Sequence, residues 1–262
     1  MNQMPQEPLV TSTVAQGVRR ITLGRMPAHP LSSAMIAALR GELDAAADDT
    51  YTRVLVIEGP GHIFCAGHDL KEIAHHRADD DNGHAFLTDL FGACAQMMLR
   101  LATHPKPTIA MVDGIATAAG LQLAASCDMV FVSDRATFCL PGVRNGGFCT
   151  TPAVAVSRAV GYKQVMELAL SAEPMDAGWA LRTGLANRVL PPESLESAVF
   201  EFAQTLATRN PGPVRDGKAA LKAHLDLPLD QAYELATEVM IGHFMDEGRL
   251  AAEIEGRTGI KI

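Results

Sequence analysis

Two spacings of hydrophobic residues alternate along about the first 150 residues of the chain. Short apolar runs bounded by polar or small residues predict strands, and these are residues 18–23, 53–58, 108–112 and 129–132. Helical spacing lies between them, and the helices are expected just after Ser32 or Ser33, at 85–103 and at 118–126. Strands that alternate with helices indicate an α/β fold whose strands are largely buried.

The pattern changes at Thr151, after which it is almost entirely helical. One short strand is expected at 187–190, and the expected helices are 151–160, 163–171, 176–183, 195–208, 213–225, 229–244 and 247–255. Thr151 as a cap, followed by Pro152, predicts the start of the first helix. We predict one domain with a core at 1–190 and a helical extension at 191–262. The apolar faces of that extension need a partner, and neighbouring subunits are expected to supply it.

Composition narrows the class of protein. The chain has 262 residues, of which 48% are hydrophobic and 20% charged, as in a globular protein with one sizeable core. The net charge of −8 argues against nucleic acid or an anionic membrane as the partner. Five cysteines without a CxxC pair predict no disulfide framework and no metal site. With neither an apolar signal-peptide core nor a long apolar run, we expect a cytoplasmic protein without a transmembrane helix.

Two stretches predict a turn from a strand into a helix. Residues 64–72 (FCAGHDLKE) follow a strand, and Asp69 with Glu72 three residues later resembles a helix cap. The backbone N–H groups near His68 would then be unpaired at a helix N-terminus. Residues 113–122 (DGIATAAGLQ) repeat the arrangement. Two such N–H groups that converge form an oxyanion hole, although two ordinary tight turns explain the same pattern.

A third stretch, residues 138–147 (FCLPGVRNGG), predicts a glycine-rich loop that could line a pocket. Together the three stretches resemble the crotonase (enoyl-CoA hydratase/isomerase) family, from about Val18 to Val189 and more loosely to the C-terminus. FCAGHDLKE is similar to the family's AGAD-type loop, KPTIAMVDGIATAAGLQLAASCD to its KPxIAxVxGxAxGGGxELALxCD segment, and TFCLPGV to its FGxPEv segment. The residues of these segments are most similar to those of one subgroup, the enoyl-CoA hydratase domain-containing proteins.

The resemblance implies a crotonase-type spiral of ββα turns with a C-terminal helical trimerisation region. It also implies a trimer or a dimer of trimers, and an acyl-CoA thioester as the ligand, with no cofactor besides the CoA of the substrate. Position by position, the oxyanion-hole donors are the N–H groups of His68 and Ala119. The residues implied in CoA binding are Ala66 and Leu70, through backbone atoms, and the cations Arg25, Arg257 and Lys261.

Two departures from the family pattern concern catalysis. Gln122 and Gly142 stand where a hydratase carries its two catalytic glutamates. Glutamine cannot ionise and glycine has no side chain, so neither can transfer the protons of hydration. We therefore expect a protein that stabilises a thioester enolate but hydrates enoyl-CoA weakly. Replacing both residues by glutamate should then recover hydration.

Two kinds of activity are compatible with the resemblance. One alternative is a lyase or isomerase that uses other groups, and the candidates are His68, Asp69, Glu72, Arg144 or the substrate itself. The other is a non-catalytic acyl-CoA-binding or regulatory protein on the same fold. Each candidate also has a structural explanation: only the backbone of His68 is needed, Asp69 caps a helix, and Arg144 forms a surface ion pair.

Overall fold

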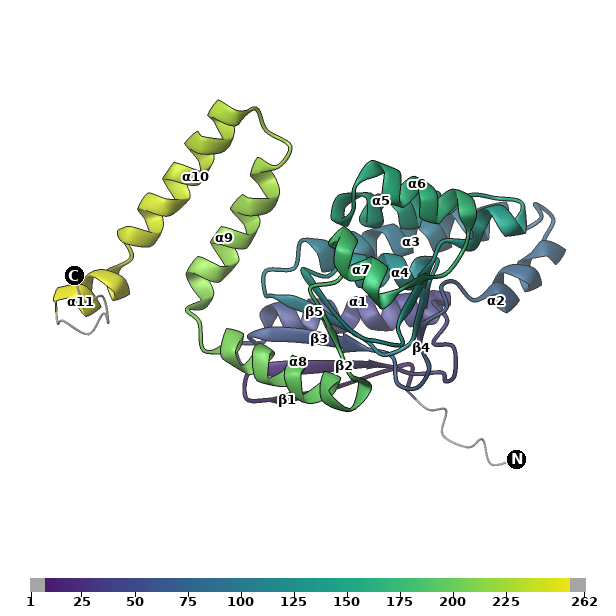
Figure 1. The fold of residues 1–262 in the computed structure, drawn as a ribbon, viewed down its shortest axis with the longest axis horizontal. Helices are drawn as coiled ribbons and strands as arrows, with labels where there is room; N and C mark the ends of the chain where they lie inside the picture. Colours follow the sequence, from purple (N-terminus) through teal and green to yellow (C-terminus); the bar gives the residue numbers. More distant parts are fainter. Residues whose placement is uncertain (1–7, 255–262) are drawn as a thin grey trace. The chain divides into compact units, whose positions relative to one another are not determined.

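The computed structural model describes residues 8–254, and the chain divides into two compact units (Figure 1). The first unit extends to Thr208 and contains all the strands of the described part of the chain. The second begins at Arg209 and is helical.

The first unit is built on two sheets. The larger has the order β1-β2-β3-β5-β7-β10, and its strands are β1 (Val10–Ala15), β2 (Val18–Leu23), β3 (Val54–Glu58), β5 (Thr108–Val112), β7 (Met129–Ser133) and β10 (Arg188–Leu190). The smaller has the order β4-β6-β8-β9, and its strands are β4 (Ile63–Cys65), β6 (Ile115–Thr117), β8 (Thr137–Cys139) and β9 (Met175–Asp176). Between residues 8 and 254, the pairs β1–β2 and β8–β9 are antiparallel and the other strand pairs are parallel.

The order of the strands shows a spiral of ββα turns. β3 and β4 precede α2 (Leu70–His75), β5 and β6 precede α4 (Ala119–Ala125), and β7 and β8 precede α5 (Thr150–Ala159). Each turn adds one strand to each sheet, because β3, β5 and β7 are neighbours in one sheet and β4, β6 and β8 in the other. The predicted fold class is therefore confirmed, and the segments that follow β4 and β6 leave neighbouring strands of the smaller sheet.

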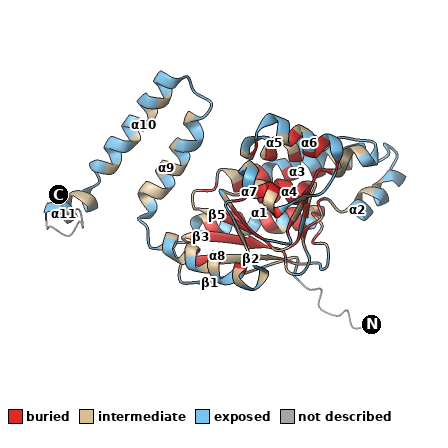
Figure 2. Ribbon diagram, viewed as in Figure 1, coloured by how far each residue is buried: buried red, intermediate tan, exposed pale blue. Residues whose placement is uncertain are grey.

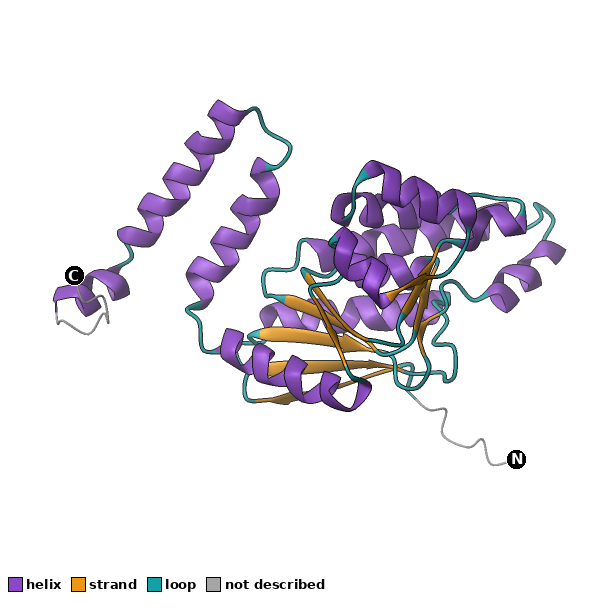
Figure 3. Cartoon of the chain, viewed as in Figure 1, coloured by secondary structure: helices purple, strands orange, loops and turns teal. Residues whose placement is uncertain are grey.

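Helices cover both faces of the larger sheet (Figures 2 and 3). Alternate residues of β3 show this, because Leu55 and Ile57 join one hydrophobic cluster while Val54 and Val56 join the other. The first cluster includes residues of α1 (Ser33–Asp48), α3 (His84–Ala102), α4, α5, α6 (Tyr162–Ser171) and α7 (Ala177–Thr183). The second includes residues of α8 (Pro192–Ala207). Two short 3₁₀ helices, His76–Ala78 and Pro141–Asn145, complete the unit.

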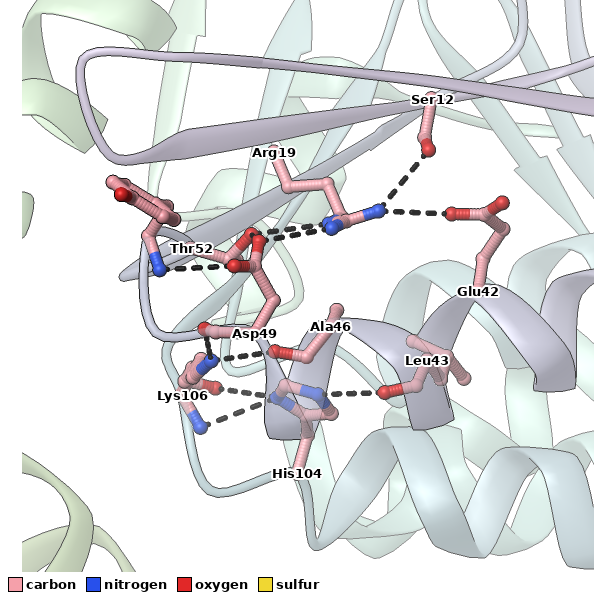
Figure 4. A network of polar contacts seen from close by, with 10 residues as sticks. Ser12, Arg19, Glu42, Leu43, Ala46, Asp49, Thr52, His104 and Lys106 are labelled. Carbon is pink, nitrogen blue, oxygen red and sulfur yellow. Dashed lines mark hydrogen bonds and ion pairs between the residues drawn. The ribbon is translucent and has the colours of Figure 1, made fainter.

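Helix α1 follows its sequence pattern closely. Ser32 is the N-cap, and its hydroxyl accepts a hydrogen bond from the Met35 N–H at 3.2 Å. The four apolar residues at helical spacing are buried, and they are Met35, Ile36, Leu39 and Leu43. At the other end, the Lys106 ammonium donates to the carbonyl oxygens of Ala46 and Asp49, both at 2.5 Å (Figure 4). The apolar spacing, the cap and the cation at the C-terminus all favour this helix.

In the described part of the chain, α3 is the one helix long and apolar enough to cross a membrane, with a mean hydropathy of 1.2. Five of its residues belong to the core, however, and they are Leu90, Cys94, Met97, Met98 and Leu101.

Helix α5 begins at Thr150 with Cys149 as its N-cap and no side-chain capping bond. The prediction of Thr151 as the cap is wrong, because the helix starts before that residue.

The first unit ends later than the predicted boundary at residue 190. Helix α8 packs on the larger sheet through Leu195, Val199 and Ala203. The Arg188 guanidinium lies 4.9 Å from the ring centre of Phe131 and 4.8 Å from that of Phe202, which joins β10, β7 and α8. Because α8 covers the sheet, it belongs to the core.

The second unit consists of α9 (Pro211–His224), α10 (Leu229–Phe244) and α11 (Glu247–Ile254). Helices α9 and α10 contain no buried residue. Large apolar side chains are exposed along the unit, and they include Leu221, Leu225, Leu229, Tyr233, Met240, Ile241, Phe244 and Met245. That this unit packs on neighbouring subunits stays a prediction.

Candidate active site

The loop after β4 is held by a short segment that precedes α1. The Leu31 N–H donates to the Gly67 carbonyl at 2.8 Å, and the Asp69 N–H donates to the Leu31 carbonyl at 3.4 Å. The Ala66 N–H donates to the Ala28 carbonyl at 2.9 Å. Residues 66–69 are therefore paired with residues 28–31 much like a strand, and Gly67, at φ +91°, makes the turn that an L side chain would strain.

The N-terminus of α4 packs against this loop. A Cβ on Gly120 would lie 2.0 Å from the Cys65 carbonyl oxygen, so only glycine fits there. A Cβ on Gly67 would lie 3.1 Å from the Ala119 nitrogen and 3.0 Å from the Ala118 Cβ. The first loop and the start of α4 therefore approach so closely at Gly67 and Ala119 that a side chain at residue 67 would be crowded.

Two backbone N–H groups lie at this close approach, those of His68 and Ala119. Ala119 is the first residue of α4, and His68 stands between the two residues that pair with Leu31. Among residues 8–254, neither of these two N–H groups donates a hydrogen bond to another protein group. Unpaired N–H groups at a strand-to-helix turn can bind a carbonyl oxygen. That the two share one oxygen atom stays a prediction.

The His68 side chain is mostly buried. Its Nδ1 lies 3.3 Å from the Leu31 carbonyl oxygen, and its ring meets the Phe91 ring edge-on with centroids 5.1 Å apart. Burial lowers the pKa of His68, because the charged imidazolium is desolvated. At neutral pH the ring is therefore uncharged, and donation from Nδ1–H leaves the lone pair on Nε2. This nitrogen can accept a proton.

The two acidic candidates next to His68 are engaged with helix N-termini. The Asp69 Oδ1 accepts from the N–H groups of Lys71 at 3.0 Å and Glu72 at 3.4 Å, so Asp69 caps α2. The Glu72 Oε2 accepts instead from the Ser33 N–H at 2.9 Å, at the start of α1. The structural explanation of Asp69 is therefore right, while Glu72 does not close a reciprocal capping box.

The positions of the missing glutamates differ in character. Gln122 is only 5% exposed, and its Oε1 has no hydrogen-bond partner among the described residues. Gly142 lies where the chain folds back on itself: a Cβ there would be 2.6 Å from the Cys149 nitrogen and 2.8 Å from the Phe148 carbonyl carbon. A side chain at residue 142 therefore requires a shift of the 148–149 backbone. This contact works against the expected recovery of hydration by two glutamates.

The remaining candidates are at the surface or outside the described part. Arg144 pairs with Glu173 at 2.5 Å, and both side chains are exposed, as the surface ion-pair explanation expects. Leu70 is 70% exposed, Arg25 is also exposed, and Ala66 is partly buried. Arg257 and Lys261 lie outside the described residues. In residues 8–254, no group of three His, Cys, Asp or Glu side chains is arranged to hold a metal ion.

Comparison with known proteins agrees with this arrangement. Residues 13–258 match the enoyl-CoA hydratase/isomerase family. The chain belongs to that family. A mitochondrial enoyl-CoA hydratase domain-containing protein 3 from Rattus norvegicus is 40% identical over 237 residues, covering 90% of this chain and 77% of the relative. This relative confirms the resemblance to that subgroup.

Solved structures agree with the fold. An enoyl-CoA hydratase/isomerase family protein from Silicibacter pomeroyi is 58% identical, covers 91% of this chain and 100% of its own, and has a TM-score of 0.86. The human enoyl-CoA hydratase domain-containing protein 3 is 33% identical, with coverage of 95% and 97% and a TM-score of 0.88.

The predicted cytoplasmic location is contradicted by these comparisons. The relatives from rat, mouse, Xenopus laevis and human are mitochondrial proteins by name. The prediction was based on the lack of an apolar signal-peptide core, which does not distinguish a cytoplasmic protein from a mitochondrial one.

Proposed function

We propose that this protein binds an acyl-CoA thioester and holds its carbonyl oxygen between the N–H groups of His68 and Ala119. The observation that carries the proposal is the close approach of Gly67 to the Ala119 nitrogen, which leaves little room for a Cβ at residue 67, beside two N–H groups that donate to no described protein group. An oxygen bound there becomes more negative when the thioester forms an enolate. Two fixed donors would stabilise that charge more than they stabilise the ground state.

We further propose that the protein is a lyase or isomerase of this family in which the His68 Nε2 accepts a proton. Asp69 and Glu72 bind helix N-termini, and Arg144 binds Glu173. Among these candidates, His68 is the one that neither binds a helix N-terminus nor forms an ion pair, and its Nε2 carries a lone pair when Nδ1 donates to Leu31. A non-catalytic acyl-CoA-binding protein on the same fold is the alternative, and turnover separates the two.

The test removes one donor without removing a side chain. Proline is well tolerated at the first helical residue, where its missing N–H has no partner within the helix. Ala119→Pro therefore deletes the proposed donor of α4, and Tyr162→Pro is the matched control at the first residue of α6. A panel of acyl-CoA thioesters is measured by thermal shift and by turnover with both variants and the unmutated protein.

We expect Ala119→Pro to lower affinity and to reduce any turnover about 10²–10³-fold, with the control near the unmutated protein. Equal effects of the two prolines would contradict the oxyanion hole. Stabilisation of the unmutated protein by acyl-CoA without turnover would favour the non-catalytic alternative. No stabilisation by any thioester would contradict the proposed function as a whole.

We also propose which residues bind the CoA part of the ligand. Ala66 and Leu70 flank the loop that carries His68, so their backbone atoms are suitably located to meet the CoA end of a thioester bound there. Arg25 is exposed at φ +63° in the neighbouring 24–31 segment, where it could meet a phosphate. Removing a single phosphate contact, as in Arg25→Gln, should weaken CoA-thioester binding more at low salt than at high salt.

We propose a homo-oligomer, a trimer or a dimer of trimers, in which the second unit contacts other subunits. The exposed apolar residues of α9 and α10 support this, because such a run of large apolar side chains usually marks an interface. Light scattering at micromolar concentration should give at least a trimer. A monomer there would contradict the assembly.

A further inference from the structure

His29 is fully buried in the segment that supports the candidate active site. It lies between β2 and α1, in the left-handed region at φ +46°. Its Nδ1 is 2.7 Å from the Gly24 carbonyl oxygen, and its Nε2 is 2.8 Å from the Pro60 carbonyl oxygen. Both ring nitrogens therefore face a backbone carbonyl at full hydrogen-bonding distance.

This geometry favours one protonation state of the ring. A carbonyl oxygen only accepts hydrogen bonds, so each of the two contacts needs an N–H on His29. A neutral imidazole has one N–H, and its other nitrogen would direct a lone pair at a carbonyl oxygen. We propose that His29 is held doubly protonated and that this imidazolium is a positioning residue, which fastens residues 24–31 and so sets the place of the His68 N–H.

The path from His29 to the site is short. The Cys65 thiol donates to the His29 carbonyl at 3.2 Å, and residues 28 and 31 carry the backbone bonds to Ala66 and Gly67. Through its contact with Pro60, His29 thus links residues 24–31 to the turn after β3, and residues 28 and 31 of the same segment bond to the loop that carries His68. Loss of one ring proton removes one of the two hydrogen bonds of the ring, so residues 24–31 are held less firmly in place.

The titratable groups of the surrounding elements leave this charge without a carboxylate partner. Arg25 of the same segment is exposed, and the Glu58 carboxylate of β3 is engaged by Arg20 and Thr22. Burial raises the pKa of the Cys65 thiol to about 12, so it stays uncharged, and His62 is exposed. In residues 8–254 no acidic side chain bonds to His29, so backbone carbonyl oxygens are the partners of both ring nitrogens.

The first experiment observes the ring nitrogens directly. Protein labelled with ¹⁵N-histidine is followed by NMR from pH 5.5 to 9, and the His29 signals are those missing from His29→Asn. Asparagine also tolerates the left-handed region, and its amide N–H can reach one carbonyl but does not titrate. Two protonated nitrogens at pH 6, changing to one at alkaline pH, are expected. A single neutral tautomer at pH 6 would overturn the proposal.

The second experiment links the proton to ligand binding, and this part rests on the proposed function. Crotonyl-CoA affinity is measured at pH 6 and pH 8.5 for the unmutated protein and for His29→Asn. Titration of the CoA phosphates affects both proteins alike, so the ratio of their affinities isolates His29. We expect the affinity of the unmutated protein, divided by that of His29→Asn, to be at least fivefold lower at pH 8.5 than at pH 6.

The outcomes separate the two proposals. If the unmutated protein binds no thioester at either pH, the proposed function fails, while the NMR result still decides the protonation of His29. If it binds and the affinity ratio does not change with pH, the positioning role of His29 is overturned. His29→Gln, which carries the same non-ionising amide on a longer side chain, repeats the comparison if His29→Asn does not fold.

Discussion

The Glu72 Oε2 accepts a hydrogen bond from the Ser33 N–H at 2.9 Å, so a carboxylate of α2 closes the N-terminus of α1. At the opposite end, the Lys106 ammonium binds the carbonyl oxygens of Ala46 and Asp49. A negative charge at the first turn of a helix and a positive charge at the last are both favourable. Glu72 therefore has a structural task, although it lies four residues from His68.

The first prediction separates this task from catalysis. Glu72→Ala should lower the free energy of unfolding by about 1–2 kcal/mol, because an N–H at the start of α1 loses its acceptor. Glu72→Gln keeps an oxygen acceptor and should lose less. Denaturant unfolding measures both, with Glu167→Gln, an exposed residue of α6, as the control for the change of charge. Thioester turnover that disappears in a stable Glu72→Gln would show that Glu72 transfers a proton.

The second prediction concerns the pH dependence of stability. Burial lowers the pKa of His68 below its ordinary value of 6.5, so in mildly acidic solution the unfolded chain binds a proton that the folded chain does not. His68 therefore contributes stability above pH 6.5, and this contribution is lost as the pH falls through the folded-state pKa.

Melting temperatures from pH 8 to pH 5 test this contribution. The unmutated protein should lose more stability on acidification than His68→Gln, which has no titrating ring. Identical slopes for His68→Gln and the unmutated protein would show that the ring is not desolvated.

The third prediction concerns backbone strain at the start of α4. Ala118 is at φ +51° and ψ −123°, a conformation that costs a residue with a Cβ about 1–3 kcal/mol. The family pattern has glycine at this position. Ala118→Gly should relieve more strain than the ~0.5–1 kcal/mol that glycine's flexibility costs, and should raise the melting temperature by about 2–4 °C.

The matched control for Ala118→Gly is Ala125→Gly at the last residue of the same helix, where glycine should lower stability. Differential scanning calorimetry measures both. If the two glycines destabilise alike, the conformation of Ala118 is not strained. If Ala118→Gly stabilises the protein and weakens thioester binding, the strain contributes to the placement of the Ala119 N–H.

The sequence predicted the features that depend on local pattern. The spacing of Met35, Ile36, Leu39 and Leu43 after Ser32 is sufficient to define α1, and the apolar runs define the buried strands. Asp69 was recognised as a cap because its partners are two and three residues away. The same local reasoning predicts Thr151 as a cap, which is wrong, because Cys149 is the N-cap and the helix begins at Thr150.

The features that were missed depend on residues far apart in the chain. Glu72 and Ser33 are 39 residues apart, and His29 and Pro60 are 31 apart. No spacing rule indicates such pairs, because they form only after the spiral brings the turns together. The crowding of Gly142 is different, since Cys149 is close in sequence, but it depends on the path of an irregular loop. For the site, the sequence gives the candidate residues, and the structure shows which have other partners.

The last prediction is that the unmutated protein hydrates crotonyl-CoA about 10⁴-fold more slowly than a hydratase with two glutamates, because an amide and a missing side chain cannot transfer its protons. The Gln122 Oε1, buried without a partner, can hold a water but cannot deprotonate it.

Gln122→Glu should recover little hydration, and adding Gly142→Glu should lower stability rather than restore hydration, because a Cβ at residue 142 meets the Cys149 nitrogen at 2.6 Å. Gly147→Glu is the matched control, since a Cβ there meets nothing closer than 3.9 Å. Loss of crotonyl-CoA absorbance measures the rate, and turnover of tens per second by the unmutated protein, ordinary for a competent enzyme, would mean that another acid–base pair acts here.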